Sequence, residues 1–194
     1  MSLRARLLAS LCLALFVTIG CGGEPPDKEM QQAQGALDAA RAAGADKYAT
    51  EEFTAATLAL NNAKDAVTQR DYRLALNHAL DSRERAQNAA KMAADGKASA
   101  RTEADRAITA AQNEINAAKT KVDGAESNKV PARLLAQPRR MVDAAQSALQ
   151  EARAAFEKGD YLEVPAKAKA ATASLATVST DLENAAGPAS RRRR

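Results

Sequence analysis

Apolar residues recur at alternating intervals of three and four along most of the chain, which is the spacing of one face of an α-helix. Between residues 53 and 93 this stripe is interrupted once, at Arg70-Asp71-Tyr72. Asp71 is a good helix N-cap, so the pattern predicts two antiparallel helices joined by a very tight turn. The stripe of this first hairpin consists of Phe53, Ala56, Leu60, Ala63 and Val67 on one arm and Tyr72, Ala75, Ala79, Ser82, Ala86, Ala89 and Ala93 on the other.

The same hairpin occurs again 89 residues further along the chain, with the turn at Gly159-Asp160-Tyr161. The segment before it is repeated as well, because residues 37–41 resemble residues 115–119 at an offset of 78, which leaves 11 extra residues in the second unit. We therefore expect two units of three helices. The second stripe consists of Val142, Ala145, Leu149, Ala152 and Phe156, followed by Tyr161, Val164, Ala168, Ala171, Leu175, Val178 and Leu182.

The helix that closes the first unit is expected to open the second. The stripe stays in phase from Ala93 through Gly96 to Val122, and a single glycine costs a helix only about 1 kcal/mol relative to alanine. We expect one helix over about 72–123, then an irregular turn from 131 and a regular helix over about 138–158. The predicted fold is all-α: an elongated antiparallel helical bundle, or a short solenoid of duplicated hairpins, sharing this long central helix.

The first 20 residues have the features of an export signal. Two arginines precede an apolar run, Leu7 to Ile19, of about 13 residues, which is too short to cross a hydrocarbon core of about 30 Å. The run ends at Gly20-Cys21 and resembles a bacterial lipoprotein signal, although Thr18 stands where that signal usually has Leu or Val. The alternative is an ordinary secretory signal with an incidental cysteine.

The resemblance to a lipoprotein signal implies cleavage before Cys21 and attachment of lipid to that residue. Gly22 follows Cys21, and in such lipoproteins an Asp at this place tends to retain the protein at the inner membrane. The resemblance therefore implies an exported protein anchored to the outer membrane and facing the periplasm. The chain is expected to comprise a signal peptide (1–20), the lipidated cysteine with a linker (21–28), a first helical unit (29–123), a second unit (124–186, sharing the helix over 98–123) and a disordered arginine-rich tail (187–194).

Composition narrows the range of functions. Hydrophobic residues make up 46% of the chain but aromatic residues only 3%, and alanine buries little area, so we expect thin cores and no deep pocket. The only cysteines are Cys12 and Cys21, which leaves the exported body without a disulfide framework. The net charge of +4 comes from the two ends, and residues 21–190 carry −2. That balance and the export signal argue against a nucleic-acid partner.

Candidate chemistry is sparse. His78 is the only histidine, so a metal site would have to be built from carboxylates, and these are scattered among basic residues as on a solvated helix face. The sequence contains no nucleophile motif and no phosphate-binding loop. We expect no catalytic residue, no cofactor, no metal and no small-molecule substrate. The one strong charge cluster is Arg191, Arg192, Arg193 and Arg194, which could contact an anionic partner.

The run Tyr48-Ala-Thr-Glu-Glu-Phe53, with Leu60-x-x-Ala63 and the Gly/Arg-Asp-Tyr turns, resembles an uncharacterised family of alanine-rich bacterial envelope proteins. It is known only as a domain of unknown function, sometimes found beside peptidoglycan-binding outer-membrane modules. The likeness covers residues 28–95 well and 124–185 loosely. The hairpins are also similar, more weakly, to tetratricopeptide repeats, but their arms are longer. Neither resemblance supplies a catalytic residue.

These observations favour a lipid-anchored periplasmic protein that serves as a non-enzymatic structural or protein-interaction component of the cell envelope. Its expected partners are the membrane, through the lipid on Cys21, and another envelope protein or peptidoglycan. The alternative is a direct binder of anionic lipid or peptidoglycan, which would use the amphipathic helices and the tail Arg191 to Arg194.

Overall fold

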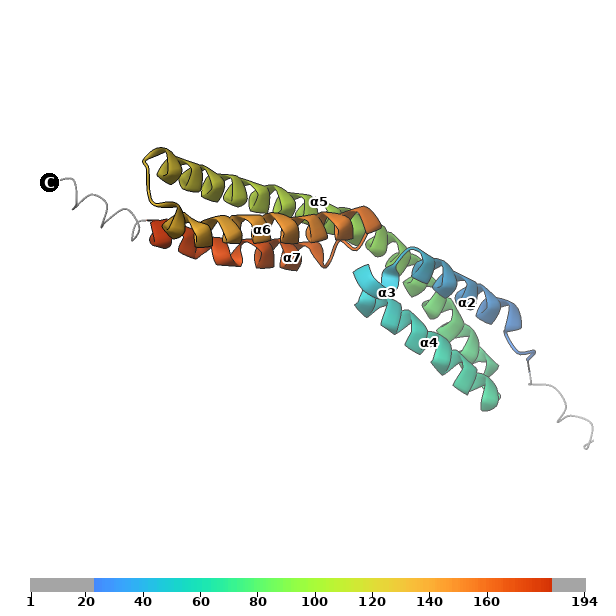
Figure 1. Cartoon of the computed structure of the whole chain (residues 1–194). Coiled ribbons are helices and arrows are strands. Elements are labelled where there is room, and N and C mark those ends of the chain that lie inside the picture. The colour runs from blue at the N-terminus through green and yellow to red at the C-terminus, as the bar shows by residue number, and fades with distance from the viewer. Residues whose placement is uncertain (1–22, 183–194) are drawn as a thin grey trace, which may run out of the picture. The chain divides into compact units, whose positions relative to one another are not determined.

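The computed structural model describes residues 23–182, and this part of the chain contains helices and no strands, so the prediction of an all-α fold is confirmed (Figure 1). Among the described residues, no helix has both the length and the apolar character needed to cross a membrane. The elements are α2 (Asp27–Ala42), α3 (Ala45–Tyr48), α4 (Thr50–Thr68), α5 (Tyr72–Ser127), α6 (Ala132–Lys158), α7 (Val164–Thr172) and the 3-10 helix η1 (Ala173–Leu175), with helical backbone again over 176–182.

Helix α5 confirms the predicted long helix. It has 56 residues and is helical through Gly96, and it ends at Ser127, four residues later than expected. The chain divides into two compact units between Gly96 and Lys97. Unit 1 therefore contains α2, α3, α4 and the first part of α5, and unit 2 contains the rest of α5 with α6, α7 and the helical segments that follow.

The core of unit 1 consists mainly of alanines from α2, α3, α4 and the first part of α5. Phe53 is its largest side chain, and the guanidinium carbon of Arg41 lies 5.3 Å from the centre of the Phe53 ring, within the range of a cation–π contact. Small side chains allow the helices to approach closely, but they bury little apolar area. The buried members are Ala33, Leu37, Ala40, Ala45, Ala49, Phe53, Ala56, Leu60, Ala86, Ala89 and Ala93.

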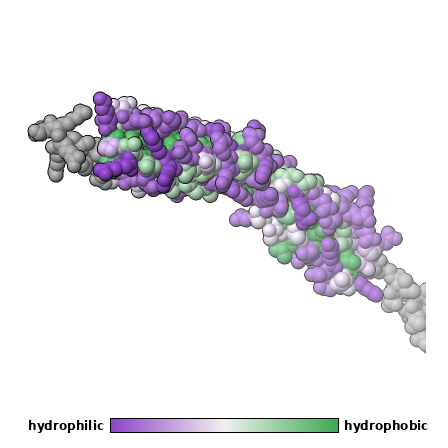
Figure 2. Space-filling view, in the orientation of Figure 1, coloured by the Kyte–Doolittle hydropathy of each residue, from purple (hydrophilic) through white to green (hydrophobic). Residues whose placement is uncertain are grey.

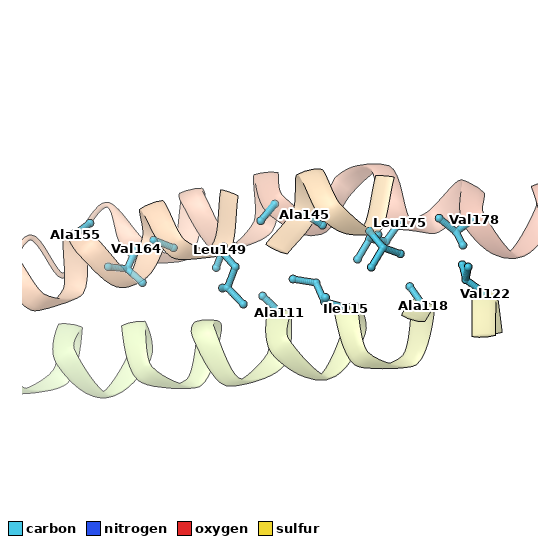
Figure 3. Packing of buried hydrophobic residues seen from close by; sticks show 14 of the residues in the cluster. Ala111, Ile115, Ala118, Val122, Ala145, Leu149, Ala155, Val164, Leu175 and Val178 are labelled. Atoms are coloured by element: carbon cyan, nitrogen blue, oxygen red, sulfur yellow. The ribbon is translucent and has the colours of Figure 1, made fainter. Parts of the chain in front are cut away.

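The core of unit 2 contains more large aliphatic side chains. Figure 3 shows Ile115 and Val122 of α5 facing Leu149 of α6 and Leu175 and Val178 of the C-terminal segments. Ile115, Leu149 and Val178 have no more than 1% of their surface exposed. Burial of a Val, Leu or Ile side chain contributes roughly 1.5–3 kcal/mol, several times what an alanine methyl provides. Unit 2 therefore has the larger hydrophobic driving force.

The duplication inferred from the sequence is visible in burial and turn geometry. Stripe positions related by the offset of 89 are buried in both units, for example Leu60 and Leu149 at 3% and 1% exposure. Each hairpin closes with the same pair of backbone hydrogen bonds. The N–H of Asp71 donates to Ala66 (2.9 Å) and that of Asp160 to Ala155 (3.0 Å), and the residue before each aspartate donates three residues back. This is a Schellman motif.

The start of α6 corrects one prediction. We expected an irregular turn from 131 to about 138, but α6 begins at Ala132 and includes Pro138. A proline within a helix removes one hydrogen bond to the carbonyl four residues earlier. Here Pro138 and Leu135 are both buried in unit 2, so apolar packing on this side of α6 offsets that loss and keeps the preceding turns helical.

The 11 extra residues of unit 2 are mostly helical. α5 ends seven residues beyond the position equivalent to the end of α2, and α6 begins seven residues before the position equivalent to the start of α4. The connection between the two helices is three residues shorter in unit 2, with four residues instead of seven. The insertion therefore lengthens both arms of the α5–α6 hairpin by about two turns.

Candidate functional surfaces

The site residues predicted from the sequence lie outside the described residues. Cys21 precedes the first described residue, Gly23, by two positions, and Arg191 to Arg194 follow the last described residue, Leu182. The proposals for these residues therefore still rest on the sequence alone.

The titratable side chains of residues 23–182 are dispersed over the helix surfaces. No three His, Cys, Asp or Glu side chains among them are close enough to hold a metal ion. Three of the five ion pairs among the described residues join residues four apart, such as Arg85 with Asp81 and Lys119 with Asp123, both at 2.9 Å. These hydrogen bonds to carboxylates raise the pKa of Arg85 and of Lys119. Exposed pairs of this kind contribute little to stability, because water and salt screen the attraction between the charges.

Ser82 is the buried polar side chain of the described core, with 0% of its surface exposed. Its hydroxyl donates a hydrogen bond of 2.8 Å to the carbonyl of Ala56 across the α4–α5 interface. A nucleophilic serine needs access to substrate and a neighbouring base that takes its proton. Ser82 is enclosed and its proton is directed at a helix carbonyl, so we assign it a structural role. The equivalent residue in unit 2 is Ala171.

One hollow of the described surface lies between α5 and α6 in unit 2. It has a volume of about 430 Å³ and is lined mainly by amide, hydroxyl and carboxylate groups, from Gln112, Asp143, Gln146, Ser147 and Gln150. Gln112 accepts a hydrogen bond from Arg153 (2.7 Å) and donates one to Asn116 (2.9 Å). The hydrogen bond from Gln112 to Asn116 has an equivalent in unit 1 at the offset of 78, where Gln34 donates to Asp38 (3.1 Å). These contacts belong to the shared helix scaffold, and the hollow is a shallow polar surface.

The end of the α4–α5 hairpin carries a different group of side chains, which we call the tip surface: Arg70, Tyr72, Arg73 and Leu74. Both arginines are exposed and Tyr72 is half-buried, and Leu74 is 41% exposed. Arg70 has a positive φ of 59°, the left-handed conformation that favours glycine. The tip surface thus presents two guanidinium groups beside an aromatic ring and an aliphatic side chain.

Asp71 fixes the backbone of the tip surface. One of its carboxylate oxygens accepts a hydrogen bond of 3.0 Å from the N–H of Leu74, which is the N-cap interaction predicted from the sequence. A carboxylate at the start of a helix also stabilises that helix, because the positive end of the helix dipole lies there. Asp71 is exposed like Arg70 and Arg73, so the turn presents two guanidinium groups and one carboxylate, with a net positive charge.

The sequence analysis treated the two hairpin turns as equivalent and missed the tip surface. The signal that could have revealed it is a comparison of the turns at the offset of 89. Arg70, Arg73 and Leu74 in the first turn correspond to Gly159, Leu162 and Glu163 in the second. Residues 70–74 of the first turn carry a net positive charge, whereas residues 159–163 of the second turn carry two carboxylates and no basic side chain.

Comparison with known proteins gives one family match. Residues 28–105 match the family model described as a domain of unknown function (DUF4398). This range begins one residue after the start of α2, contains α3 and α4, and ends in α5 nine residues beyond Gly96, the end of unit 1. It agrees with the resemblance seen in the sequence over residues 28–95. No curated protein and no solved structure matches the chain.

Proposed function

We propose that this protein is a lipid-anchored component of the bacterial cell envelope that acts without catalysis, through contacts of its helical units with other envelope components. The observation that carries the proposal is Gly20-Cys21 directly after an apolar run of about 13 residues that begins behind two arginines. Gly22 after the cysteine favours the outer membrane, facing the periplasm.

The segment between Cys21 and the folded body is short. Helix α2 begins at Asp27, six residues after Cys21, so the linker spans at most about 20 Å even when fully extended. Two or more acyl chains on one cysteine hold a protein firmly to a bilayer, whereas one chain gives only marginal binding. A protein attached in this way would keep unit 1 close to the membrane surface.

Replacing the cysteine tests the proposal directly. In the Cys21→Ala variant we expect the protein to leave the membrane fraction, because no thiol remains for lipid attachment. The measurements are fractionation of the expressing cells and the intact mass of the purified protein, which reports whether acyl chains are present.

Cys12→Ala is the matched control, since this cysteine lies within the apolar run that the proposal assigns to the removed signal. That variant should remain in the membrane fraction with the same intact mass as the unaltered protein. If Cys21→Ala stayed in the membrane fraction, or if the unaltered protein carried no acyl chains, anchoring through Cys21 would be wrong.

A further inference from the structure

We infer that the tip surface of unit 1 (Arg70, Tyr72, Arg73 and Leu74) is a second membrane contact that lies against the anionic surface of the bilayer. This inference rests on the proposed attachment of lipid to Cys21. The partner is an anionic phospholipid surface, and the contact would orient unit 1 on the membrane that holds the anchor.

The tip surface and the N-terminal linker lie at the same end of unit 1. α2 and the first part of α5 run in the same direction, because α4 reverses the chain between them (Figure 1). Gln32, early in α2, accepts a hydrogen bond of 2.6 Å from Arg83 of α5. Near the other end of the unit, Gly96 of α5 lies against Tyr48 of α3. The start of α2 therefore points toward the α4–α5 turn.

The linker is long enough for the tip surface to reach the bilayer. At 1.5 Å per residue, Tyr72 lies about 16 Å along α5 from Arg83, and Asp27 lies about 7 Å along α2 from Gln32. The tip surface thus extends about 9 Å beyond the start of α2. The six residues from Cys21 to Asp27 span up to about 20 Å, so the lipid on Cys21 can be inserted while the tip surface touches the headgroups.

The side chains of the tip surface suit a bilayer interface. Tyrosine places an apolar ring and a polar hydroxyl at headgroup level, and arginine lays its aliphatic stem along apolar surface while the guanidinium reaches phosphate. Leu74 and, two turns further along α5, Leu80 are 41% and 38% exposed. Figure 2 shows hydrophobic surface among the polar side chains of unit 1, over α4 and toward its end at the turn.

The second hairpin serves as an internal comparison. Its turn keeps the tyrosine, as Tyr161, and has an exposed leucine, Leu162, at 56%. It has no arginine, and Asp160 and Glu163 make it acidic. The two turns share the Schellman hydrogen bonds, although α5 begins directly after Asp71 and α7 only at Val164. They differ in charge, which is the property that an anionic surface distinguishes, and of the two only the turn near the start of α2 is basic.

The test uses the full-length, lipidated protein in vesicles of phosphatidylethanolamine and phosphatidylglycerol. Cys12 lies in the signal and Cys21 would carry the lipid, so a cysteine introduced by Leu74→Cys is the single free thiol of the processed protein and can be labelled with a fluorophore. Lipids carrying a nitroxide quencher report contact with the bilayer surface. We expect strong quenching of the label at position 74.

Met92→Cys is the matched control. Met92 is also an exposed apolar side chain of α5, at 52% exposure, but it lies about 27 Å further along the helix. Its label should be quenched much less than the label at position 74. Equal quenching at the two positions, or none at position 74, would overturn the inference while the intact mass still shows lipidation. A mass without acyl chains would instead overturn the proposed function, and with it this inference.

The charge dependence is tested with Arg70→Gly and Arg73→Gln in the labelled Leu74→Cys protein. On anionic vesicles, each substitution should lower the ratio of membrane-bound to unbound tip surface about fivefold, because one basic side chain near the anionic surface is lost. Neither substitution should change quenching on phosphatidylcholine vesicles. Arg70→Gly does not weaken the fold, because glycine favours the φ of this position, so a loss of quenching cannot be attributed to unfolding. Unchanged quenching on anionic vesicles in the variant that carries both substitutions would overturn the proposed electrostatic contact.

Discussion

Gly96 lies where α5 passes closest to the end of α3. A Cβ atom added at Gly96 would be 2.9 Å from the backbone oxygen of Tyr48 and 3.2 Å from its Cβ. Contacts below 3.0 Å to backbone cannot be relieved by rotating a side chain, so the helices would have to move apart. Helix propensity alone gives the opposite expectation, since alanine is the better helix former.

We therefore expect Gly96→Ala to destabilise unit 1. The clash resembles overpacking, which typically costs about 1–3 kcal/mol, and exceeds the gain of about 1 kcal/mol in helix propensity. The free energy of unfolding from urea titration measures the net effect. Gly35→Ala in α2 is the control, because no atom lies within 4 Å of a Cβ there, and it should stabilise the protein by about 0.5–1 kcal/mol. Stabilisation by both substitutions would show that α3 does not require this close approach.

At the scale of elements, the two hairpin turns share a Schellman motif and a left-handed residue, but α5 begins directly after Asp71 whereas residues 161–163 form a turn before α7. The left-handed position is occupied by Arg70 in the first turn, with φ 59°, and by Gly159 in the second, with φ 85°. For a residue with a Cβ, this conformation costs roughly 1–2 kcal/mol.

Reciprocal substitutions test this assignment. Arg70→Gly should raise the free energy of unfolding by up to about 1 kcal/mol, because it relieves the strained φ. Gly159→Ala should lower it by about 1 kcal/mol for the opposite reason. Both effects can be read from urea midpoints at constant m-value. If Gly159→Ala were neutral, the second turn would not need its left-handed residue.

The elements of this chain were largely predictable because helix stripes, caps and repeats are local signals. The offset of 89 identified both hairpins, and Asp71 marked the start of α5. The start of α6 was not predictable, because Pro138 is tolerated only through burial beside Leu135, and burial depends on neighbours distant in sequence. The tip surface was missed for a related reason: the spacing that predicts the turn does not show which side chains remain exposed around it. The roles of Cys21 and Arg191 to Arg194 stay predictions, since these residues lie outside the described chain.

On the scale of the whole molecule, two separate cores imply two stabilities. The buried large side chains of unit 1 are Leu37, Phe53 and Leu60, whereas the core of unit 2 includes Ile115, Leu135, Leu149, Leu175 and Leu182 together with several valines. Because apolar area is the main driving force for folding, unit 1 should open more readily than unit 2.

Hydrogen exchange followed by mass spectrometry can separate the units. Leu60→Ala and Leu149→Ala each remove a side chain that is at least 97% buried, which typically costs about 2–5 kcal/mol. We expect Leu60→Ala to reduce protection of amides in α2 and α4 and to spare α6 and α7, and Leu149→Ala to do the reverse. A loss of protection in both units from either substitution would show that they unfold as one.

The alanine-rich core of unit 1 also bears on temperature. Unfolding raises the heat capacity in proportion to the apolar area that becomes exposed to water, and this increase gives the free energy of unfolding its curvature with temperature. A core built largely of methyl groups exposes little such area for each residue that unfolds. The free energy of unfolding of unit 1 should therefore have a modest maximum and change little with temperature on either side of it.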